Sequence, residues 1–364
     1  MAHLNLDARN LGLVRRAVDE TLAGFLDGKA QGPYGSLLEA PLRILRGFLD
    51  GGGKRVRPLY LCVGWHAVEG RAITPAVLRA AAGIELFHTF ALLHDDVIDG
   101  SDTRHGLPTV PRQFASLCAG AGAGRFGDGA AVLLGDLCEV WSTELLEGAD
   151  MPALAREALA AMRTELVVGQ YLDLCAGGER VGTVEHALKV IHYKTTKYTV
   201  ERPLQIGAAL AGADHAVLDA CTAYARPVGE AFQLLDDLQD VLPEDEGGTA
   251  DGSDLREGKH TVVLTLAVGR CTTAQAERLR RLVGDRALDA RGLAEARALI
   301  AATGAPETVK AMILEWRRQA MEALGRTPFH PSIPAILRHL TDLAIPQVAA
   351  WPEAGTALPS PLRT

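Results

Sequence analysis

The chain has 364 residues, of which 48% are hydrophobic and 23% are charged, a composition typical of a soluble globular protein with a large core. Its net charge of −8 argues against a nucleic-acid-binding surface and leaves no basic stripe for anionic lipids. Aromatic residues make up only 5%, and Ala and Leu are abundant, which favours helices over strands. We therefore expect an all-α protein.

Signals for membrane targeting and for disulfides or zinc are scarce. No apolar run reaches about 18 residues, so we expect no membrane span. Residues 1–7 do not resemble a signal peptide, so we expect a cytoplasmic protein. The six cysteines are scattered, with no CxxC spacing and no paired histidine, and indicate neither a zinc site nor a disulfide framework.

The N-terminal part contains two predicted helices followed by a basic, glycine-rich segment. Amphipathic patterns predict helices over residues 7–26 and 37–49. Lys54, Arg55 and Arg57 then follow a glycine run, which suits phosphate binding because glycines let the backbone approach and the cations supply charge. The GxxxxGK[ST] pattern of a P-loop is absent. The alternative is a solvated basic helix start.

A helix predicted over residues 75–98 ends in the first aspartate cluster, Asp95, Asp96 and Asp99. These carboxylates repel one another near the negative end of the helix dipole, so we expect a cation there. Oxygen ligands without His or Cys favour a hard ion such as Mg²⁺. The alternative is a solvated acidic helix end. His88 lies two turns earlier on nearly the same face, where it could donate to a phosphate oxygen.

The middle of the chain reads as a loop followed by further helices. Gly and Pro mark a loop over residues 100–108, which we expect to hold Arg104 and His105 above the first cluster. A GxGxxG string at residues 122–127 has no preceding strand, so we interpret it as an interhelical loop and not as a dinucleotide site. Further helices are predicted over residues 130–146, 152–174 and 184–210.

Four further residues, three of them cations, are candidate phosphate ligands. Lys194 and Thr195 lie in the helix over 184–210, which Pro203 interrupts. Alone, they would be ordinary surface residues. Arg256 and Lys259 follow the second acidic cluster and could bring positive charge to a diphosphate.

The spacing of the first cluster recurs 141 positions later, at Asp236, Asp237 and Asp240, again at the end of an apolar helical stretch. If the two helices face each other across a bundle, six carboxylates line one cavity mouth. That charge density is tolerable only with about two or three divalent cations and a polyanion between them. The simplest such polyanion is a diphosphate.

These features match a known family, the trans-isoprenyl diphosphate synthases or polyprenyl synthetases. The resemblance covers roughly residues 37–266 and rests on six motifs in the family's order. The motifs are GGKRxRP at 52–58, HxxxLLHDDxxD at 88–99, RHG at 104–106, KT at 194–195, FQLxDDxxD at 232–240 and DLREGK at 254–259. Several motifs in register are far more specific than any one of them alone.

The resemblance implies a fold and an assembly. The family fold is an isoprenoid synthase-type helical bundle around a deep central cavity, and its members are usually homodimers. We therefore expect a single polyprenyl synthetase domain over residues 1–350, followed by a Pro-rich tail over 351–364. The implied partners are isopentenyl diphosphate and an allylic diphosphate, with two or three Mg²⁺ ions as cofactor.

The resemblance also implies roles for individual residues. By the match, Asp95, Asp99 and Asp236 would be Mg²⁺ ligands, supported by Asp96, Asp237 and Asp240. The allylic diphosphate would be held by Lys194, Thr195, Gln233, Lys259 and Arg104. The diphosphate of isopentenyl diphosphate would be held by Lys54, Arg57, His88 and His105. Two departures from the family pattern are His105, where a second Arg is usual, and Thr249, where a Lys is usual.

The implied reaction is the condensation of the two diphosphates without a side-chain nucleophile. One alternative is a terpene cyclase, which ionises a prenyl diphosphate but takes no second substrate; the presence of Lys54, Arg57 and His88 favours condensation. Another is an inactive regulatory subunit, which would be expected to have lost aspartates. Both clusters are complete here.

Product length in this family is limited by side chains one turn before the first cluster. Phe90 and Ala91 lie five and four positions before Asp95, about one helical turn deeper. A single aromatic with a small neighbour resembles synthases that make geranylgeranyl diphosphate. The alternative is a farnesyl diphosphate synthase.

Overall fold

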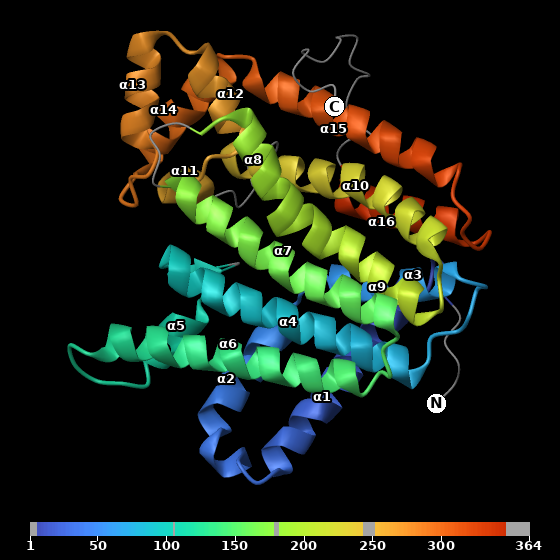
Figure 1. Cartoon of the computed structure of the whole chain (residues 1–364). Coiled ribbons are helices and arrows are strands. Elements are labelled where there is room, and N and C mark those ends of the chain that lie inside the picture. Colours follow the sequence, from blue (N-terminus) through green and yellow to red (C-terminus); the bar gives the residue numbers. More distant parts are fainter. Residues whose placement is uncertain (1–5, 105, 178–181, 243–251, 347–364) are drawn as a thin grey trace. The chain divides into compact units, whose positions relative to one another are not determined.

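The structure, a computed structural model, describes residues 6–104, 106–177, 182–242 and 252–346. In this part of the chain helices dominate and the strands form one two-stranded hairpin, so the prediction of an all-α fold is confirmed (Figure 1). The chain divides into two compact units. Unit 1 comprises Met1–Arg156 with Ile206–Gly212, and unit 2 comprises Glu157–Gln205 with Ala213–Thr364. His105, Thr249 and the tail predicted at 351–364 lie outside the described residues.

Unit 1 is built around two long helices that run side by side, α4 and α6 (Figure 1). Its elements are α1 (Leu11–Gln31), η1 (Gly35–Leu37), α2 (Glu39–Asp50), α3 (Val56–Ala67), α4 (Pro75–Asp99), β1 (Thr103–Arg104), β2 (Leu107–Pro108), α5 (Val110–Ala115) and α6 (Ala123–Glu147). Gly83 of α4 lies against α6, where an added Cβ would come within 2.8 Å of Leu146 Cγ. This close approach packs α4, whose end carries the first aspartate cluster, against α6.

Local signals explain why α4 begins and ends where it does. The Thr74 side chain accepts a hydrogen bond from the Val77 N–H, and Pro75 occupies the first turn, where its missing N–H costs nothing. Gly100 ends the helix with φ 63, a left-handed conformation that glycine adopts without strain. The prediction of a helix over residues 75–98 is therefore confirmed to within a residue.

The helix α4 is also long and apolar enough to cross a membrane by length and composition. Its most apolar window has a mean hydropathy of 1.5, although the sequence analysis found no apolar run of that length. The difference arises because the window tolerates isolated charged residues. Since 61% of it is buried and the core helix of a soluble protein passes the same test, this helix is weak evidence for a membrane span.

The glycine-rich segment before α6 differs from the sequence prediction. We expected an interhelical loop at residues 122–127, but α6 begins at Ala123 and includes Gly124 and Gly127. An added Cβ at Gly127 would lie 2.3 Å from the Pro111 carbonyl oxygen. Glycine is needed here for close packing against α5 and not for a turn.

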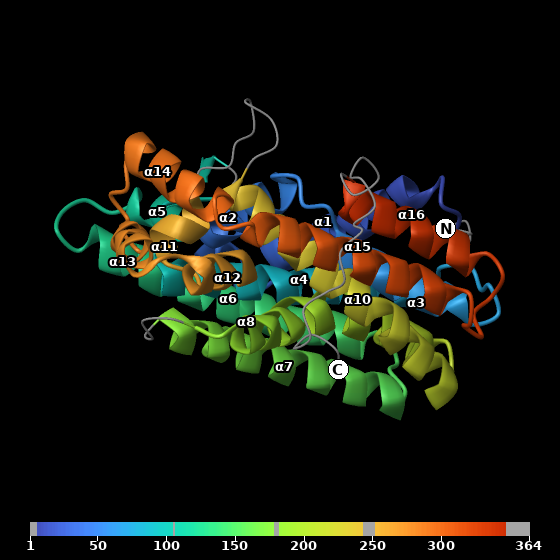
Figure 2. The same cartoon turned by 90° about the horizontal axis from the view of Figure 1, so that it is seen from above.

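Unit 2 is organised around α10, and α15 lies along it in both Figure 1 and Figure 2. Its elements are α7 (Ala153–Gly177), α8 (Val184–Val190), η2 (Ile191–Glu201), α9 (Arg202–Leu210), α10 (His215–Val241), α11 (Ser253–Glu257), α12 (Val262–Arg270), α13 (Thr273–Leu282), α14 (Ala290–Ala301), α15 (Ala305–Leu324) and α16 (Ile333–Ala344). The first residues of α7 and the last of α9 belong to unit 1. Buried Leu234, Leu235 and Leu238 of α10 pack in one apolar core with residues of α12, α14 and α15.

Candidate active site

The first aspartate cluster, in unit 1, is already partly neutralised by an arginine. Asp96 is buried, and its Oδ1 accepts hydrogen bonds from Arg104 Nε at 3.0 Å and Nη2 at 2.8 Å. The same Nη2 lies 3.5 Å from Asp95 Oδ2. Burial by itself lowers the pKa of Arg104, but Asp96 and Asp95 outweigh it and hold that pKa above its ordinary value. Asp95 and Asp99, one turn apart, remain half-buried at the helix end.

A short hairpin positions Arg104. Its strands β1 and β2 pair antiparallel, and Gly106 between them has φ 76. The Thr109 hydroxyl donates to the Ser101 carbonyl at 2.8 Å, which ties the hairpin to the chain that leaves α4. The loop predicted over residues 100–108 thus contains this hairpin, and it does bring Arg104 to the cluster as predicted.

Arg55 in the basic segment is used inside unit 1. It is 8% exposed and adopts a left-handed conformation with φ 51. Its guanidinium donates to Asp19 Oδ1 at 2.7 Å, Glu85 Oε1 at 2.8 Å and the Leu49 carbonyl at 2.6 Å. Burial raises the pKa of Glu85, and Arg55 opposes that shift. Of the three basic residues seen in the sequence, Arg55 therefore orders the segment and is not presented to a ligand.

Arg57 and His88, by contrast, come together as the sequence analysis expected. Arg57 Nη1 lies 3.0 Å from His88 Nε2. Because a guanidinium only donates, Nε2 must accept and the ring is neutral. Burial lowers the pKa of His88 well below its ordinary value, and Arg57 and Arg104 lower it further. Lys54 is exposed.

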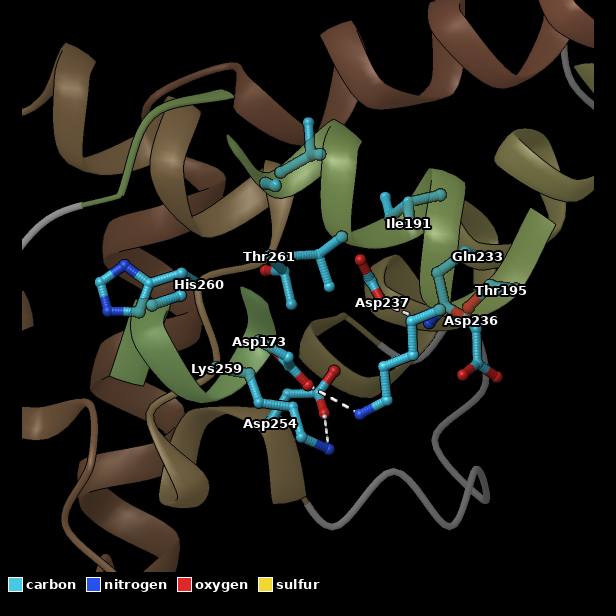
Figure 3. A pocket seen from close by; sticks show the side chains of 15 residues that line it. Asp173, Ile191, Thr195, Gln233, Asp236, Asp237, Asp254, Lys259, His260 and Thr261 are labelled. Carbon is cyan, nitrogen blue, oxygen red and sulfur yellow. Dashed lines mark hydrogen bonds and ion pairs between the residues drawn. The ribbon is translucent and has the colours of Figure 1, made fainter. Parts of the chain in front are cut away.

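A pocket of about 140 Å³ lies within unit 2 (Figure 3). Its lining includes most of the residues that the resemblance assigned to the allylic diphosphate and to the second aspartate cluster. It is lined by residues of α7, α8, η2, α10, α11 and the start of α12, and of the segment between α11 and α12. The polar residues among them are Asp173, Lys194, Thr195, Gln233, Asp236, Asp237, Asp254, Lys259, His260 and Thr261. In Figure 3, Thr195, Gln233 and Asp237 lie on one side of the pocket, and Lys259 and Asp254 lie on the other.

The Thr195 side of the pocket is a short hydrogen-bonded chain. The Thr195 hydroxyl donates to Gln233 Oε1 at 2.8 Å, and Gln233 Nε2 donates to Asp237 Oδ1 at 2.7 Å. This arrangement fixes the Gln233 amide, because its oxygen must face Thr195 and its nitrogen must face Asp237. The structure thus joins two residues that the resemblance assigned to the allylic diphosphate, Thr195 and Gln233, to one that it assigned to the metal, Asp237.

Each lysine of the pocket is paired with a carboxylate. Lys194 Nζ lies 2.7 Å from Asp173 Oδ2, and Lys259 Nζ lies 3.1 Å from Asp254 Oδ1 and 2.9 Å from Glu257 Oε2. Sequence reasoning missed all three acidic partners. Asp254 and Glu257 stand inside the DLREGK motif, which was a usable signal, but no local pattern marks Asp173.

The pocket carries more negative than positive charge. Burial raises the pKa of Asp237 well above its ordinary value, Asp254 raises it further, and the hydrogen bond from Gln233 opposes the shift. Burial also raises the pKa of Asp254 to about 6, against the opposing effect of Lys259. Both shifts arise mainly from burial, and Lys259 offsets them only in part. A bound cation would lower both pKa values and favour the charged carboxylates.

The ligand atoms available in this pocket are of the type that binds Mg²⁺. They are carboxylate oxygens, which Mg²⁺ prefers, and Asp236 is exposed at the pocket. Across the described ranges, no three His, Cys, Asp or Glu side chains lie close enough together to hold a metal ion by themselves. Mg²⁺ is usually bound through one or two carboxylates, with waters and substrate phosphates completing its shell. Asp95, Asp99 and Asp236 are the residues that could supply such ligands.

The segment that carries Lys194 and Thr195 is a π-helix, η2. The sequence predicted an ordinary helix over residues 184–210, interrupted by Pro203. Glycines let two neighbouring helices approach η2 closely. A Cβ on Gly169 would lie 2.4 Å from the Lys194 nitrogen, and one on Gly229 would lie 2.7 Å from the Thr196 Cα. Such widened turns occur frequently at functional sites. Here the widened turn presents both residues to the pocket.

Asp240, predicted to support a metal ion, is engaged by protein donors. Its Oδ1 accepts from the Ser253 N–H at 3.2 Å and from the Ser253 hydroxyl at 3.1 Å. Its Oδ2 accepts from the Asp254 N–H at 2.9 Å. The carboxylate therefore faces the first turn of α11, which leads into Asp254 and Lys259.

Comparison with known proteins places the chain in a family. A family model described as polyprenyl synthetase matches residues 39–300. The geranylgeranyl diphosphate synthase of Methanosarcina mazei is 33% identical over 60% of this chain, a stretch that spans 64% of the relative's length. The short chain isoprenyl diphosphate synthase of Methanothermobacter thermautotrophicus is 32% identical over 79% of this chain and 84% of the relative. The nonaprenyl diphosphate synthase of Mycobacterium tuberculosis is 30% identical over 78% and 79%.

A solved structure agrees with these relatives over nearly the whole chain. It is the geranylgeranyl pyrophosphate synthase from Corynebacterium glutamicum, complexed with isoprenyl diphosphate and magnesium. It shares 34% sequence identity, covers 93% of this chain and 99% of its own, and superposes with a TM-score of 0.86. With the family model matched over residues 39–300, this likeness shows that the chain belongs to the polyprenyl synthetase family of trans-isoprenyl diphosphate synthases and is a trans-prenyltransferase.

Proposed function

We propose that the chain catalyses the Mg²⁺-dependent condensation of isopentenyl diphosphate with an allylic diphosphate, and that both units together make one catalytic domain. The observation that carries this proposal is the pocket of unit 2. It combines Lys194 and Lys259, which can bind phosphate oxygens, with Asp236 and Asp237 in an excess of negative charge that favours a divalent cation. A Mg²⁺–diphosphate complex offers a cation to these carboxylates and phosphate oxygens to these lysines.

The proposed substrate contacts follow from the charges in each unit. Lys194 and Lys259 would exchange Asp173 and Asp254 for phosphate oxygens of the allylic substrate, with Thr195 and Gln233 as neutral donors. Arg104 would add a cation from unit 1. For isopentenyl diphosphate, the proposed ligands are Lys54, Arg57, His88 and His105. The contact of Arg57 with a neutral His88 does not neutralise the guanidinium, so its positive charge can attract a phosphate.

The chemistry needs no nucleophilic side chain. The bond between the allylic carbon and its diphosphate oxygen breaks, the double bond of isopentenyl diphosphate attacks the resulting cation, and a proton is then lost to the departed diphosphate. Lys194, Lys259 and Arg104 would stabilise the charge that develops on the leaving group, where a single donor is worth about 2.7–4 kcal/mol. Mg²⁺ held by Asp95, Asp99 and Asp236 would supply further neutralisation of the same diphosphate.

The test is turnover by the full chain. Purified protein is incubated with isopentenyl diphosphate, Mg²⁺ and in turn dimethylallyl, geranyl and farnesyl diphosphate, and the products are separated by chain length. We expect condensation with at least one allylic substrate and none in EDTA. Lys194→Met should abolish it, whereas Lys189→Met, an exposed lysine paired with Glu185 on the preceding helix, should not. Consumption of the allylic diphosphate without isopentenyl diphosphate would indicate a cyclase instead.

We propose geranylgeranyl diphosphate as the main product, with farnesyl diphosphate as the alternative. The support is the single aromatic at Phe90 beside Ala91, and several relatives with geranylgeranyl in their names, although other relatives make longer chains. In unit 1 the Phe90 ring lies 5.3 Å from the Phe87 ring and 4.6 Å from the His94 ring, centroid to centroid. These neighbours restrict the rotamers open to Phe90, as a fixed limit on chain length would require.

We also propose a cytoplasmic homodimer that associates through α6. Phe126, Leu133 and Val140 are spaced seven residues apart on this helix, so they share one face, and they are 48%, 66% and 57% exposed. Large apolar side chains gathered on one exposed face are typical of subunit interfaces. Sedimentation of the wild type and of a Leu133→Glu/Val140→Glu variant tests this, with dissociation expected only in the variant.

A further inference from the structure

Asp240 closes the DDxxD pattern of the second cluster, but its carboxylate is turned to protein donors. Three donors reach it, two on Oδ1 and one on Oδ2, at 2.9–3.2 Å. A carboxylate oxygen has about two lone-pair sites, so both sites of Oδ1 are taken. Entry of Oδ1 into a metal shell would leave the Ser253 N–H or hydroxyl without its acceptor. The Asp240 carboxylate, near the end of α10, thus caps the first turn of α11.

The contacts of α11 show what this cap controls. Gly252 before it and Gly258 after it both have left-handed φ, 69 and 74, so its two flanks are fixed turns. Leu255 is buried, and its carbonyl accepts from the Gly284 N–H at 2.8 Å. The Lys259 N–H donates to the Asp254 carbonyl at 2.9 Å. A contact that fixes the position of the first turn of α11 therefore also fixes the positions of Asp254 and Lys259.

A second contact holds Asp240 itself in place. Arg297 of α14 donates from Nε to the Val241 carbonyl at 2.7 Å and from Nη2 to the Asp240 carbonyl at 3.3 Å. These two carbonyls belong to the last turn of α10, where a cation is favoured by the helix dipole. The end of α10 is thereby anchored from one side by Arg297 and tied to α11 from the other by the Asp240 carboxylate.

We propose that Asp240 is a positioning residue and not a magnesium ligand: it fixes α11 so that Lys259 and Asp254 point into the pocket that receives the diphosphate. The spacing of the motif misleads here, because the three aspartates of the cluster have three different surroundings. Asp236 is exposed at the pocket, Asp237 is hydrogen-bonded to Gln233, and Asp240 faces away to α11. The role of Lys259 in this inference rests on the proposed function.

The first experiment does not depend on catalysis. Amide hydrogen exchange of the full chain is measured without metal in the wild type, Asp240→Ala and Asp240→Asn, with Asp236→Asn as the matched control. We expect exchange of the Ser253 and Asp254 amides to speed up at least tenfold in Asp240→Ala. In Asp240→Asn the Asp254 amide should be affected most, because the new NH₂ group cannot accept its hydrogen bond. Asp236→Asn should leave both amides unchanged.

The second experiment measures the consequence for the substrate. If Asp240 acts through Lys259, then Asp240→Ala and Lys259→Ala should each raise the KM of the allylic substrate about tenfold to a hundredfold. The double variant should be no worse than Lys259→Ala alone. The Mg²⁺ concentration for half-maximal rate should stay at the wild-type value in Asp240→Ala but rise in Asp236→Asn.

The opposite results would overturn the proposal. These are unchanged exchange at Ser253 and Asp254 in both Asp240 variants, or a Mg²⁺ requirement raised as far as in Asp236→Asn with effects that add to those of Lys259→Ala. A wild type without condensing activity would contradict the proposed function alone, because the exchange result would still decide whether Asp240 holds α11.

Discussion

Units 1 and 2 contain the same acidic spacing in different electrostatic surroundings. In unit 1 the middle aspartate, Asp96, is buried against the guanidinium of Arg104 at 2.8 Å. In unit 2 the corresponding Asp237 is buried against the neutral amide of Gln233 at 2.7 Å. One cluster is thus balanced by a fixed charge of the protein, while the buried carboxylate of the other is hydrogen-bonded to a neutral group and loses its charge more readily by binding a proton. Equal spacing in a sequence does not imply equal charge states in a fold.

This difference indicates which cluster changes its charge with pH and with bound cations. Arg104 is charged at every accessible pH, so the balance at Asp96 is permanent. Asp237 and Asp254 have raised pKa values, so the charge of unit 2 changes with pH and with bound cations. We infer that unit 2 has the stronger response to metal and to protons, and unit 1 depends more on its arginine for stability.

The largest expected effect is on turnover. Asp236→Ala and Asp95→Ala should each lower kcat by more than about a hundredfold, the usual cost of losing a group that stabilises transition-state charge. Asp236 is exposed, so its removal should leave helix content unchanged by circular dichroism. Retention of more than about a tenth of the wild-type rate at saturating Mg²⁺ would contradict the assignment of either residue to metal.

The loss of unfolding free energy should be larger when the partner of the first cluster is removed than when the partner of the second cluster is removed. Arg104→Ala leaves the buried Asp96 carboxylate without its cation and should cost about 3 kcal/mol of unfolding free energy. Gln233→Ala removes only neutral hydrogen bonds to Asp237 and Thr195 and should cost about 1 kcal/mol. Urea unfolding measures both. Adding Asp96→Asn to Arg104→Ala should recover part of the loss, and equal losses in the two single variants would break the comparison.

Local sequence signals predicted α4 and its cluster well because the determinants are adjacent in the chain. Thr74, Pro75 and Gly100 mark the helix ends within one residue of where they occur. The two DDxxD spacings indicated oxygen ligands and a diphosphate, and the family membership is confirmed. Arg104 was also expected at the first cluster, since its loop directly follows the helix.

The parts that escaped prediction depend on contacts distant in sequence. The π-helix forms where Gly169 and Gly229 bring other helices against it, and no pattern within residues 191–201 reveals either contact. Arg55 and Arg57 look alike in the sequence, yet Arg55 turns inward because Asp19 and Glu85 lie beside it. The partners of the pocket lysines, Asp173 among them, were missed for the same reason.

A smaller effect is expected in the pH dependence of stability without metal. The pKa of Asp254 is about 6 in the folded chain, against 3.8 for an ordinary Asp. Between these values the folded state keeps a proton that the unfolded state has lost, so the contribution of Asp254 to stability is full below about pH 4 and is lost as pH rises through 6. Asp237 acts in the same direction.

Substitution identifies the group responsible. Asp254→Asn should flatten the fall in unfolding free energy between pH 4 and 6, measured by urea unfolding in EDTA, because the amide does not titrate. Asp219→Asn, at an exposed position on α10, should leave the slope unchanged. A slope that is the same in the wild type and in Asp254→Asn would show that unit 2 does not carry the pH response assigned to it.

The smallest effect on rate, and the sharpest contrast between the units, concerns product length. Phe90 and Ala91 lie five and four positions before Asp95, and the order is reversed before Asp236, where Ala231 precedes Phe232. We assign chain length to unit 1 alone. Ala91→Phe should fill the space beside the Phe90 ring and shift product to farnesyl diphosphate, and Phe90→Ala should lengthen it, with kcat changed by less than about tenfold. The matched substitution Phe232→Leu in unit 2 should leave the product distribution as it is. If Phe232→Leu shifts the distribution while Ala91→Phe does not, product length is controlled from α10, and the contrast between the two units fails at this point.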